Sequence, residues 1–307
     1  MFVERCIMKL LSLFPFLCLF FSCVSNSGYS QKELEVEIIA HKIVKLRKFK
    51  QLEQAEFKDL SAVPAEPDYS KGIKPFPGLG MAGVPVLDQG QFGTCMTFSS
   101  TAALDALVQQ GDFISQQCSL ELDLGLGNDY WDGANMPNEI IDPLAQYGVV
   151  SQANCPDAYG SSQSSTIDVA TYKSLVDPSA SQIVSSVNYS YSPSIDLAKL
   201  KTAIGAGHRV LIGFRVNSSY AEAVRGFNVV ADDVTYQGGL WACQQGKSKN
   251  YCANSKAGHE SLVIGFDDAQ QLIRIRNSWN TVVGLNGDYF MSYKYLSSMG
   301  IDMTEIW

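Results

Sequence analysis

The segment Gln89-Gly90-Gln91-Phe92-Gly93-Thr94-Cys95-Met96-Thr97-Phe98 carries one cysteine through a glycine-containing turn to the start of an apolar run. The run from Cys95 to Gln110 is apolar on nearly every side, which is the pattern of a buried helix. Gly111 is a typical residue to end it. The sequence therefore predicts a buried helix over residues 95–110, with a thiol in its first turn and the amide side chain of Gln89 shortly before it.

The position of Cys95 makes it a candidate nucleophile. A thiolate attacks readily, whereas a neutral thiol does not. The N-terminus of a helix carries roughly half a positive charge, which favours the thiolate, and Gly93 is expected to let the backbone turn tightly just before it. The plain alternative is a small buried hydrophobe, but a helix start behind a glycine-rich turn is an unusual place for one.

A thiolate nucleophile needs a base, and the chain has three histidines. His41 lies in a basic N-terminal run, and His208 lies in a glycine-rich turn where a structural role is expected. His259 begins a predicted strand behind Gly258, so it is the candidate base. A histidinium beside the cysteine would lower the pKa of the thiol further.

The strand that begins at His259 is expected to form a hairpin around the turn residues Asp267-Asp268-Ala269. A three-residue loop would place His259 directly opposite Asn277, with their Cβ atoms about 4.5–5.5 Å apart. The amide could then hydrogen-bond the imidazole and fix its tautomer. The same register would place Glu260 opposite Arg276 on the other face.

Gln89 is the candidate oxyanion donor. Its side-chain N–H, beside the backbone N–H of Cys95, could bind the negative oxygen of a tetrahedral intermediate. Gln89-Gly90 by itself indicates only a turn. Glutamine, cysteine, histidine and asparagine in this order are far more specific than any of them alone.

This order resembles the papain-like cysteine peptidases, over roughly residues 84–300. The family consensus around the nucleophile is Gln-Gly-x-Cys-Gly-Ser-Cys-Trp-Ala-Phe, and the chain keeps these positions in register: Gln89, Gly90, Gly93, Cys95 and Phe98. The departures are Phe92 for a disulfide cysteine, Thr94 for Ser, Met96 for Trp and Thr97 for Ala.

The segments Gly258-His259, Asn277-Ser278-Trp279 and Gly287-Asp288-Tyr289-Phe290 also match the family pattern. The resemblance implies an α+β, papain-like two-lobe fold, with a helical left lobe, an antiparallel β-barrel-like right lobe and the active site in the cleft between them. It implies a thiol endopeptidase with a Cys95–His259–Asn277 triad, Gln89 at the oxyanion, and Trp279 shielding the His259–Asn277 pair from water.

The same residues are also compatible with other activities. The triad could catalyse exopeptidase or transamidase reactions, or the chain could be a catalytically inactive papain-like protein that binds peptides. No metal or organic cofactor is implied. A Cys/His zinc site is disfavoured because the chain has no Cys-x-x-Cys motif and no second histidine near His259 in sequence.

Three parts are expected along the chain: a signal peptide over 1–27, an N-terminal prosegment and linker over 28–82, and a papain-like peptidase domain over 83–307. The apolar stretch from Leu10 to Phe21 is shorter than the roughly 20 residues of a membrane span, and small residues follow it. Secretion or periplasmic export is therefore expected, without stable membrane insertion. Lipoprotein anchoring at Cys23 is the less favoured alternative.

The prosegment is expected to act as an intramolecular inhibitor of a monomeric enzyme. It does not match the family's common helical prosegment signature: alternation at Leu34, Val36 and Ile38 predicts a strand, and residues 48–60 read as a helix. Proline and glycine residues then indicate an extended linker. The basic run over 41–50 is either a solvated face or a segment that docks on the acidic body.

Charge and cysteines give two further expectations. The net charge of −8 argues against nucleic acid as a main partner. The resemblance to papain-like peptidases implies protein or peptide substrates. In an exported protein, the four cysteines that remain after Cys95 and those near the signal predict two disulfides. Cys243 is expected to pair with Cys252, and Cys118 with Cys155; four reduced, buried thiols are the alternative.

Overall fold

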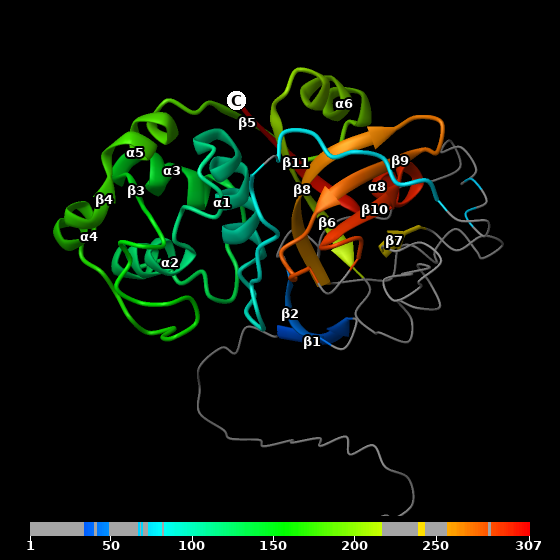
Figure 1. The fold of residues 1–307 in the computed structure, drawn as a ribbon. Helices are drawn as coiled ribbons and strands as arrows, with labels where there is room; N and C mark the ends of the chain where they lie inside the picture. The colour runs from blue at the N-terminus through cyan, green and yellow to red at the C-terminus, as the bar shows by residue number, and fades with distance from the viewer. Residues whose placement is uncertain are drawn as a thin grey trace, which may run out of the picture. The chain divides into compact units, whose positions relative to one another are not determined.

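The computed structural model describes residues 34–39, 42–48, 67, 69, 73–81, 83–216, 239–242, 257–281 and 284–307 (Figure 1). The helices are α1 (Cys95–Val108), α2 (Gln116–Gly125), α3 (Asn138–Tyr147), α4 (Val169–Leu175), α5 (Pro178–Ser185), α6 (Leu197–Gly205) and α8 (Tyr293–Met299). The strands are β1 (Leu34–Ile39), β2 (Lys42–Lys48), β3 (Val149–Val150), β4 (Val176–Asp177), β5 (Tyr189–Ser192), β6 (Arg209–Val216), β7 (Gly239–Trp241), β8 (Ala257–Asp267), β9 (Leu272–Arg276), β10 (Asp288–Ser292) and β11 (Gly300–Ile306).

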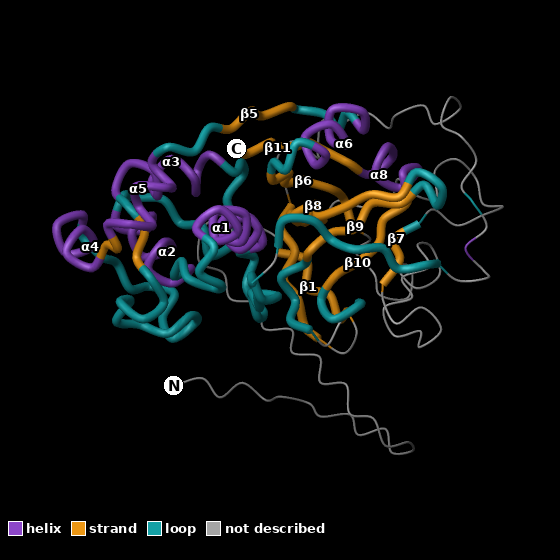
Figure 2. Tube along the Cα trace, turned by 45° about the horizontal axis from the view of Figure 1, so that its top comes forward, coloured by secondary structure: helices purple, strands orange, loops and turns teal. Residues whose placement is uncertain are grey.

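Helix α1 begins at Cys95, as the sequence predicts, and is buried along nearly its whole length. It ends at Val108, two residues earlier than expected, because Gln109 adopts a left-handed conformation with φ of 60°. Gly111 follows, also with positive φ. Small residues let the helix approach the sheet closely: Ala102 packs in one cluster with Leu262. Figure 2 shows α1 end-on, between the other helices of its lobe and the sheet.

Helices α1 to α5 form one lobe, and acidic or hydroxyl side chains begin several of them. Ser115 accepts a hydrogen bond from the backbone N–H of Cys118 at the start of α2, and Asp168 and Asp177 do the same for α4 and α5. Helix α3 spans Asn138–Tyr147, and Gly148 follows it with a positive φ. These caps fix where the short helices begin in a region whose sequence shows only mixed helix and loop.

The second lobe is a nine-stranded sheet with the path β5-β11-β6-β8-β9-β10-β7, to which the β1–β2 hairpin is attached at β8. All pairings on this path are antiparallel except that of β10 with β7. One face of the sheet packs against α6 and α8, in a core that includes Phe214, Val263 and Trp279. The other face packs against α1. Strand β8 therefore lies at the centre of the sheet and next to the helical lobe.

The N-terminal hairpin confirms the predicted strand at residues 34–38 and adds β2 within the basic run. Lys48 ends β2, so the predicted helix does not begin there; residues 49–60 lie outside the described residues. Strand β2 pairs antiparallel with β8 at two positions, Arg47 with Gly258 and Lys48 with Ala257. These two residues of β8 come directly before His259.

The chain before α1 is anchored on the sheet. Tyr69 and Ile73 are buried in a cluster with Phe290 and its neighbours. Arg274 donates a hydrogen bond to the carbonyl of Phe76, and its guanidinium also binds the Asp288 carboxylate. Residues of the expected linker thus make specific contacts with the body of the protein. In the described part of the chain, no helix combines the length and the apolar character needed to cross a bilayer.

Candidate active site

Cys95 is the first residue of α1 and is only 3% exposed. The residue before it, Thr94, does not cap the helix with its side chain; its hydroxyl instead lies 2.7 Å from the hydroxyl of Tyr159. No acidic residue stands in the first turn. The positive end of the helix dipole is therefore not offset by a side chain of the helix itself, which favours a thiolate at Cys95.

Gly93 is required for a reason that differs from the predicted one. Its φ is not positive, but a Cβ there would lie 3.0–3.2 Å from the backbone of Asp132. The loop that presents Cys95 can thus pack directly on a neighbouring loop only because residue 93 has no side chain.

An aromatic cluster occupies the place where the family has a disulfide cysteine. The ring of Phe92 contacts Trp131 and Tyr159 edge-on, with centroids 5.1 and 5.7 Å apart. Tyr159 also contacts Phe98 of α1 at 4.7 Å. Aromatic packing of this kind holds the loop against the helical lobe. Met96, where the family has tryptophan, is fully buried in the core of the same lobe.

His259 lies in β8, opposite Phe214 of β6. Its Nε2 is 2.7 Å from the Oδ1 of Asn277. The backbone N–H of Ser278 donates to the same oxygen at 2.8 Å, so this atom is an acceptor and Nε2 carries the proton. The proton-free atom is then Nδ1, which is buried and has no hydrogen-bond partner among the described residues. The imidazole therefore presents a basic nitrogen without a competing bond.

Trp279 covers this pair. Its indole ring stacks on the imidazole of His259 with centroids 4.4 Å apart and planes inclined by 27°, and the indole is fully buried. Phe214 and Trp241 contact the imidazole edge-on. Burial in these surroundings lowers the pKa of His259 to about 4, although the bond to Asn277 acts in the opposite direction. In this state the imidazole is neutral at neutral pH.

The register of the hairpin is not the predicted one. Strands β8 and β9 pair Leu262, not Glu260, with Arg276, and the ladder shifts between Val263 and Gly265. The loop is also longer than three residues, since β8 ends at Asp267 and β9 begins at Leu272.

Asn277 follows the end of β9, and its backbone N–H donates to the carbonyl of Gly287. It reaches His259 from this position rather than as a facing strand residue. The predicted hydrogen bond is thus present, but the predicted pairing that suggested it is wrong. Counting residues outward from the turn cannot predict a β-bulge, because the bulge adds an unpaired residue to one strand.

Gln89 is fully buried and held from both ends of its amide. Its Nε2 donates to the carbonyl of Phe92 at 2.9 Å, and its Oε1 accepts from the hydroxyl of Ser278 at 2.6 Å. Its backbone N–H donates to the carbonyl of Ser278, and its backbone carbonyl accepts from Tyr159. One amide hydrogen of Nε2 remains for another acceptor.

These contacts join three of the predicted residues through a short chain of bonds. Gln89 binds Ser278, Ser278 follows Asn277, and Asn277 binds His259. Helix α1, which carries Cys95, packs against β8, which carries His259. Two residues were missed from the sequence. Ser278 stood inside the matched segment and could have been singled out, whereas nothing in the sequence marked Tyr159.

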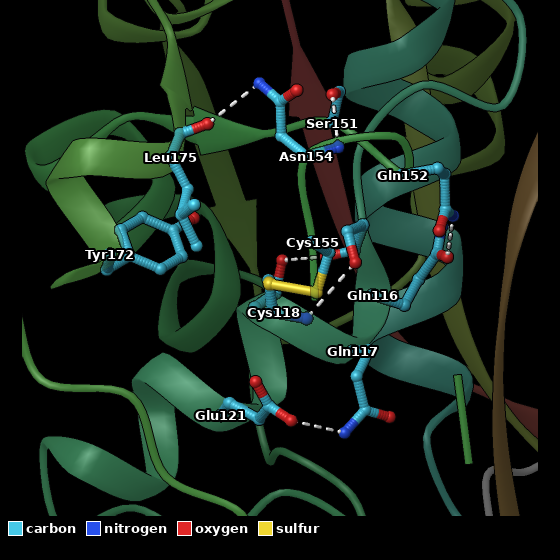
Figure 3. Close-up of a disulfide and its surroundings, with 12 residues drawn as sticks. Gln116, Gln117, Cys118, Glu121, Ser151, Gln152, Asn154, Cys155, Tyr172 and Leu175 are labelled. Atoms are coloured by element: carbon cyan, nitrogen blue, oxygen red, sulfur yellow. Dashed lines mark hydrogen bonds between the residues drawn. A yellow bond between two sulfur atoms is a disulfide. The ribbon is translucent and has the colours of Figure 1, made fainter. Parts of the chain in front are cut away.

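The predicted disulfide between Cys118 and Cys155 is present, and it links α2 to the loop after β3 (Figure 3). Cys95 keeps its thiol. The predicted Cys243–Cys252 pair lies outside the described residues. Within the described ranges, Cys118, Glu121 and Cys155 are the one group with donors spaced for a metal. Because the disulfide occupies both sulfurs, this group does not fit a thiolate-bound zinc.

His208, the other described histidine, has the structural surroundings expected for it. Its Nδ1 lies 2.5 Å from a carboxylate oxygen of Glu305, and its ring stacks on Trp307. It directly precedes β6, which begins at Arg209.

No family model matches the sequence. The chain is 24% identical over 212 residues to cysteine proteinase 2 of Entamoeba histolytica, covering 66% of this chain and 58% of that protein. It is 25% identical over 215 residues to the thiol protease aleurain of Arabidopsis thaliana, covering 67% of this chain and 52% of that protein. The chain thus spans a little over half the length of these relatives.

Among solved structures, xylellain, a cysteine protease from Xylella fastidiosa, matches with a TM-score of 0.54 and 22% identity, over 79% of this chain and 90% of that one. A mite allergen structure of Blo t 1 and Der p 1 matches with a TM-score of 0.52 and 16% identity, over 79% of this chain and 74% of that one. The two-lobe α+β fold is therefore that of the papain-like cysteine proteases. The expected resemblance to papain-like cysteine peptidases is confirmed, and the matches support a cysteine-type peptidase.

Proposed function

We propose that this chain is an exported cysteine endopeptidase, made as a zymogen, that hydrolyses peptide bonds in proteins or peptides. The observation that carries the proposal is the His259–Asn277 bond, which puts the proton on Nε2 and leaves Nδ1 buried with no hydrogen-bond partner in the described part of the chain. An imidazole fixed in this tautomer can act as a base that accepts a proton at Nδ1. Cys95 on the neighbouring helix is the nucleophile.

In the proposed reaction, the Cys95 thiol gives its proton to Nδ1 of His259, and the thiolate attacks the scissile carbonyl carbon. The C–N bond breaks as the imidazolium returns the proton to the leaving amine, so a thioester remains on Cys95. A water molecule, deprotonated by His259, then attacks the thioester and releases the acid product and the thiol. Asn277 keeps the ring oriented through both halves.

Gln89 would stabilise the oxyanion in both tetrahedral intermediates. Its amide is held by Ser278 and the Phe92 carbonyl, so it is positioned before substrate arrives. Pre-positioned donors lower the barrier because they need no reorganisation during the reaction. The backbone N–H of Cys95 would be the second donor.

The burial of the centre supports a latent state. Cys95 is 3% exposed, His259 and Gln89 are fully buried, and Asn277 is 2% exposed. The nucleophile and its base are thus largely covered in this state. In the same state the pKa of His259 is lowered by burial, which disfavours the thiolate–imidazolium pair. Opening the centre to water would remove this desolvation and raise the pKa of His259.

The β1–β2 hairpin is the proposed inhibitory element. Strand β2 adds to β8 at Ala257 and Gly258, directly before His259. We propose that activation removes this hairpin, with cleavage before Pro67, because Tyr69 and Ile73 are already part of the core of the body. This places the boundary earlier than the sequence suggested.

Export is supported by the Cys118–Cys155 bond, since disulfides persist in oxidising compartments. The expected signal over residues 1–27 lies outside the described residues, as does Cys23. N-terminal sequencing of the exported protein tests both: a start after residue 22 with a lipid on Cys23 would favour anchoring, and an unmodified start near residue 28 would favour release.

The test of the activity is a cleavage profile on a peptide library with the wild-type protein and with Cys95→Ala. We expect cleavage inside peptides by the first and none by the second. Removal of single residues from peptide ends would indicate an exopeptidase, and transfer of the acyl group to an added amine in preference to water would indicate a transamidase. A wild-type protein that binds peptides without cleaving them would favour the inactive binding protein.

A further inference from the structure

The hydroxyl of Tyr159 binds both ends of the loop that presents the candidate nucleophile. It donates a hydrogen bond to the backbone carbonyl of Gln89 at 2.9 Å, and it lies 2.7 Å from the hydroxyl of Thr94. Tyr159 has one hydroxyl hydrogen, and the carbonyl of Gln89 takes it, so Thr94 is the donor in the second bond. A directed chain of hydrogen bonds therefore runs from Thr94 through Tyr159 to Gln89.

The two partners of Tyr159 are the residues that hold the proposed oxyanion donors. The side-chain amide of Gln89 is one donor. Thr94 directly precedes Cys95, so the peptide group between them carries the backbone N–H of Cys95, which is the other donor. One phenolic oxygen thus binds the chain on both sides of the proposed oxyanion site. A displacement of about 1 Å in groups of this kind can lower a rate about a hundredfold.

Aromatic packing holds the ring of Tyr159, independently of its hydroxyl. The ring stacks on Trp131 with centroids 5.7 Å apart and planes inclined by 24°. It also meets Phe98 of α1 and Phe92 of the loop edge-on. A phenylalanine at position 159 can keep these ring contacts. The substitution Tyr159→Phe therefore removes the two hydrogen bonds and little else.

The loop that carries Tyr159 is tied to α2 at two points. Cys155 is joined to Cys118 by the disulfide (Figure 3), and the backbone N–H of Gly160 donates to the side-chain oxygen of Gln117 at 2.9 Å. Gln117 and Cys118 are consecutive residues of one helix. The residues on both sides of Tyr159 are thus fixed to the same rigid element, so the hydroxyl is positioned from outside the nucleophile loop.

The hydroxyl of Tyr159 remains protonated when the nucleophile is charged. Burial raises the pKa of Tyr159 above its ordinary value, and the nearby Asp88 and Cys95 act in the same direction, whereas the bond from Thr94 opposes them. A thiolate at Cys95 disfavours a phenolate because like charges repel. The hydroxyl therefore keeps the hydrogen that binds the carbonyl of Gln89.

We propose that Tyr159 is a positioning residue of the oxyanion site, whose hydroxyl aligns Gln89 and the peptide between Thr94 and Cys95 before substrate binds. This inference rests on the proposed peptidase function and adds a residue to the same site. Tyr159 acts through Gln89 and Thr94, and not by contact with the reacting atoms.

The first test compares Tyr159→Phe with Tyr172→Phe in the activated full-length protein. Tyr172 is the matched control, because its buried hydroxyl donates to the carbonyl of Gly148 at 3.0 Å in the same lobe. Both substitutions remove one buried hydroxyl bound to a carbonyl, and both should lower the melting temperature. We expect Tyr159→Phe to lower kcat about tenfold on one peptide while KM changes less than about twofold. Tyr172→Phe should keep the wild-type kcat and KM.

Thr94 provides a test of the chain of bonds. Thr94→Val removes the hydroxyl and nearly keeps the shape of the side chain, whereas Thr94→Ser keeps the hydroxyl and should retain most of the wild-type kcat. Because Thr94 acts through Tyr159, the double variant Thr94→Val/Tyr159→Phe should have the kcat of Tyr159→Phe within about twofold. Two effects that simply multiply would contradict the chain. If melting curves show that Tyr159→Phe is not folded, Thr94→Val replaces it in the kinetic comparison with Tyr172→Phe.

Binding of a peptide aldehyde measures the oxyanion site without any cleavage. The sulfur of Cys95 bonds to the aldehyde carbon, the carbonyl π bond opens, and the thiol proton passes to His259 or to the new oxygen. This oxygen takes the position of the oxyanion. Tyr159→Phe should weaken the aldehyde about tenfold and leave the affinity of the matching peptide alcohol, which cannot form the bond to sulfur, unchanged.

The two measurements together separate this proposal from the peptidase function. Cleavage by the wild type with an unchanged kcat in Tyr159→Phe would overturn the positioning role and leave the peptidase standing. Aldehyde binding that Tyr159→Phe weakens, without cleavage by the wild type, would overturn the peptidase and support the positioning role. A wild-type protein that neither cleaves peptides nor binds the aldehyde would overturn both.

Discussion

The Nε2 atom of His259 lies 2.7 Å from the Oδ1 atom of Asn277, although the two residues do not face each other in a strand ladder. The bond fixes the tautomer of the imidazole because the Ser278 N–H donates to the same oxygen. A hydrogen bond of a charged group contributes about 1.5–3 kcal/mol. We expect Asn277→Ala to lower kcat/KM about 10- to 100-fold.

The measurement for Asn277 is the pH profile of kcat/KM in both proteins. In Asn277→Ala, the value of kcat/KM should fall and the apparent pKa of His259 in the profile should also change, because Asn277 stabilises the imidazolium. Asn154→Ala, which removes an exposed amide bound to the Leu175 carbonyl in the helical lobe, is the control. An Asn277→Ala protein with wild-type kcat/KM and an unchanged profile would remove Asn277 from the mechanism.

Gln89 should affect the chemical step more than substrate binding. Removing one oxyanion donor costs about 10²–10³-fold in kcat in comparable sites, so Gln89→Ala is expected to lower kcat by this factor with little change in KM. Ser278→Ala removes only the bond that holds the amide and should lower kcat less. Steady-state kinetics on one peptide decide this, and equal effects of both substitutions on KM alone would contradict the oxyanion role.

The helix of Cys95, the strand of His259 and the residue that binds it could be read from the sequence because each depends on local pattern. A continuous apolar run predicts α1, and the hairpin pattern around residues 267–269 predicts the strand that begins at His259. The end of α1 could not be placed, because Gln109 takes a left-handed conformation that its residue type does not demand. The β8–β9 register could not be predicted from the sequence either, because the bulge between Val263 and Gly265 depends on tertiary packing.

Residues that act through long-range contacts were harder to find. Tyr159 binds both Gln89 and Thr94, some 65 to 70 residues away in sequence. Glu260 and Asp302 meet only because three strands from distant parts of the chain lie side by side. Neither the contacts of Tyr159 nor the proximity of Glu260 and Asp302 can be predicted from residue spacing in a single sequence.

The pairing of β2 with β8 predicts how activation can be accelerated. Proline lacks a backbone N–H and is excluded from paired positions in a sheet. Arg47→Pro should therefore loosen the hairpin from β8 and shorten the lag before peptidase activity appears, whereas Arg47→Ala should have a smaller effect. The time course of activation, followed with a fluorogenic peptide and by gel, measures this. Identical lag times for the wild type and Arg47→Pro would count against the inhibitory hairpin.

Asp105 predicts a pH dependence of stability. Burial raises its pKa to about 8, against about 3.9 in an unfolded chain. Between these values the folded protein binds the extra proton, so the contribution of Asp105 to the free energy of unfolding falls as pH rises from about 4 to 8, by up to about 1.4 kcal/mol per pH unit. Asp105→Asn keeps an oxygen for the N–H groups of Phe113 and Ile114 and removes the charge.

Melting temperatures of both proteins between pH 5 and pH 8.5 test this. Asp105→Asn should match the wild type near pH 5 and exceed it near pH 8, while Asp129→Asn, at an exposed loop carboxylate, should follow the wild type throughout. Parallel curves for the wild type and Asp105→Asn would show that Asp105 does not bind a proton in the folded state.

The most direct measurement is the rate at which iodoacetamide alkylates Cys95 as a function of pH, followed by mass spectrometry of the Cys95 peptide after activation of the full-length protein. If His259 holds Cys95 as a thiolate, alkylation is already near its maximal rate at pH 6. In His259→Ala it should rise with a pKa close to the 8.5 or so of an ordinary thiol. A wild-type rate that follows the same curve as His259→Ala would contradict the ion pair and, with it, the proposed peptidase mechanism.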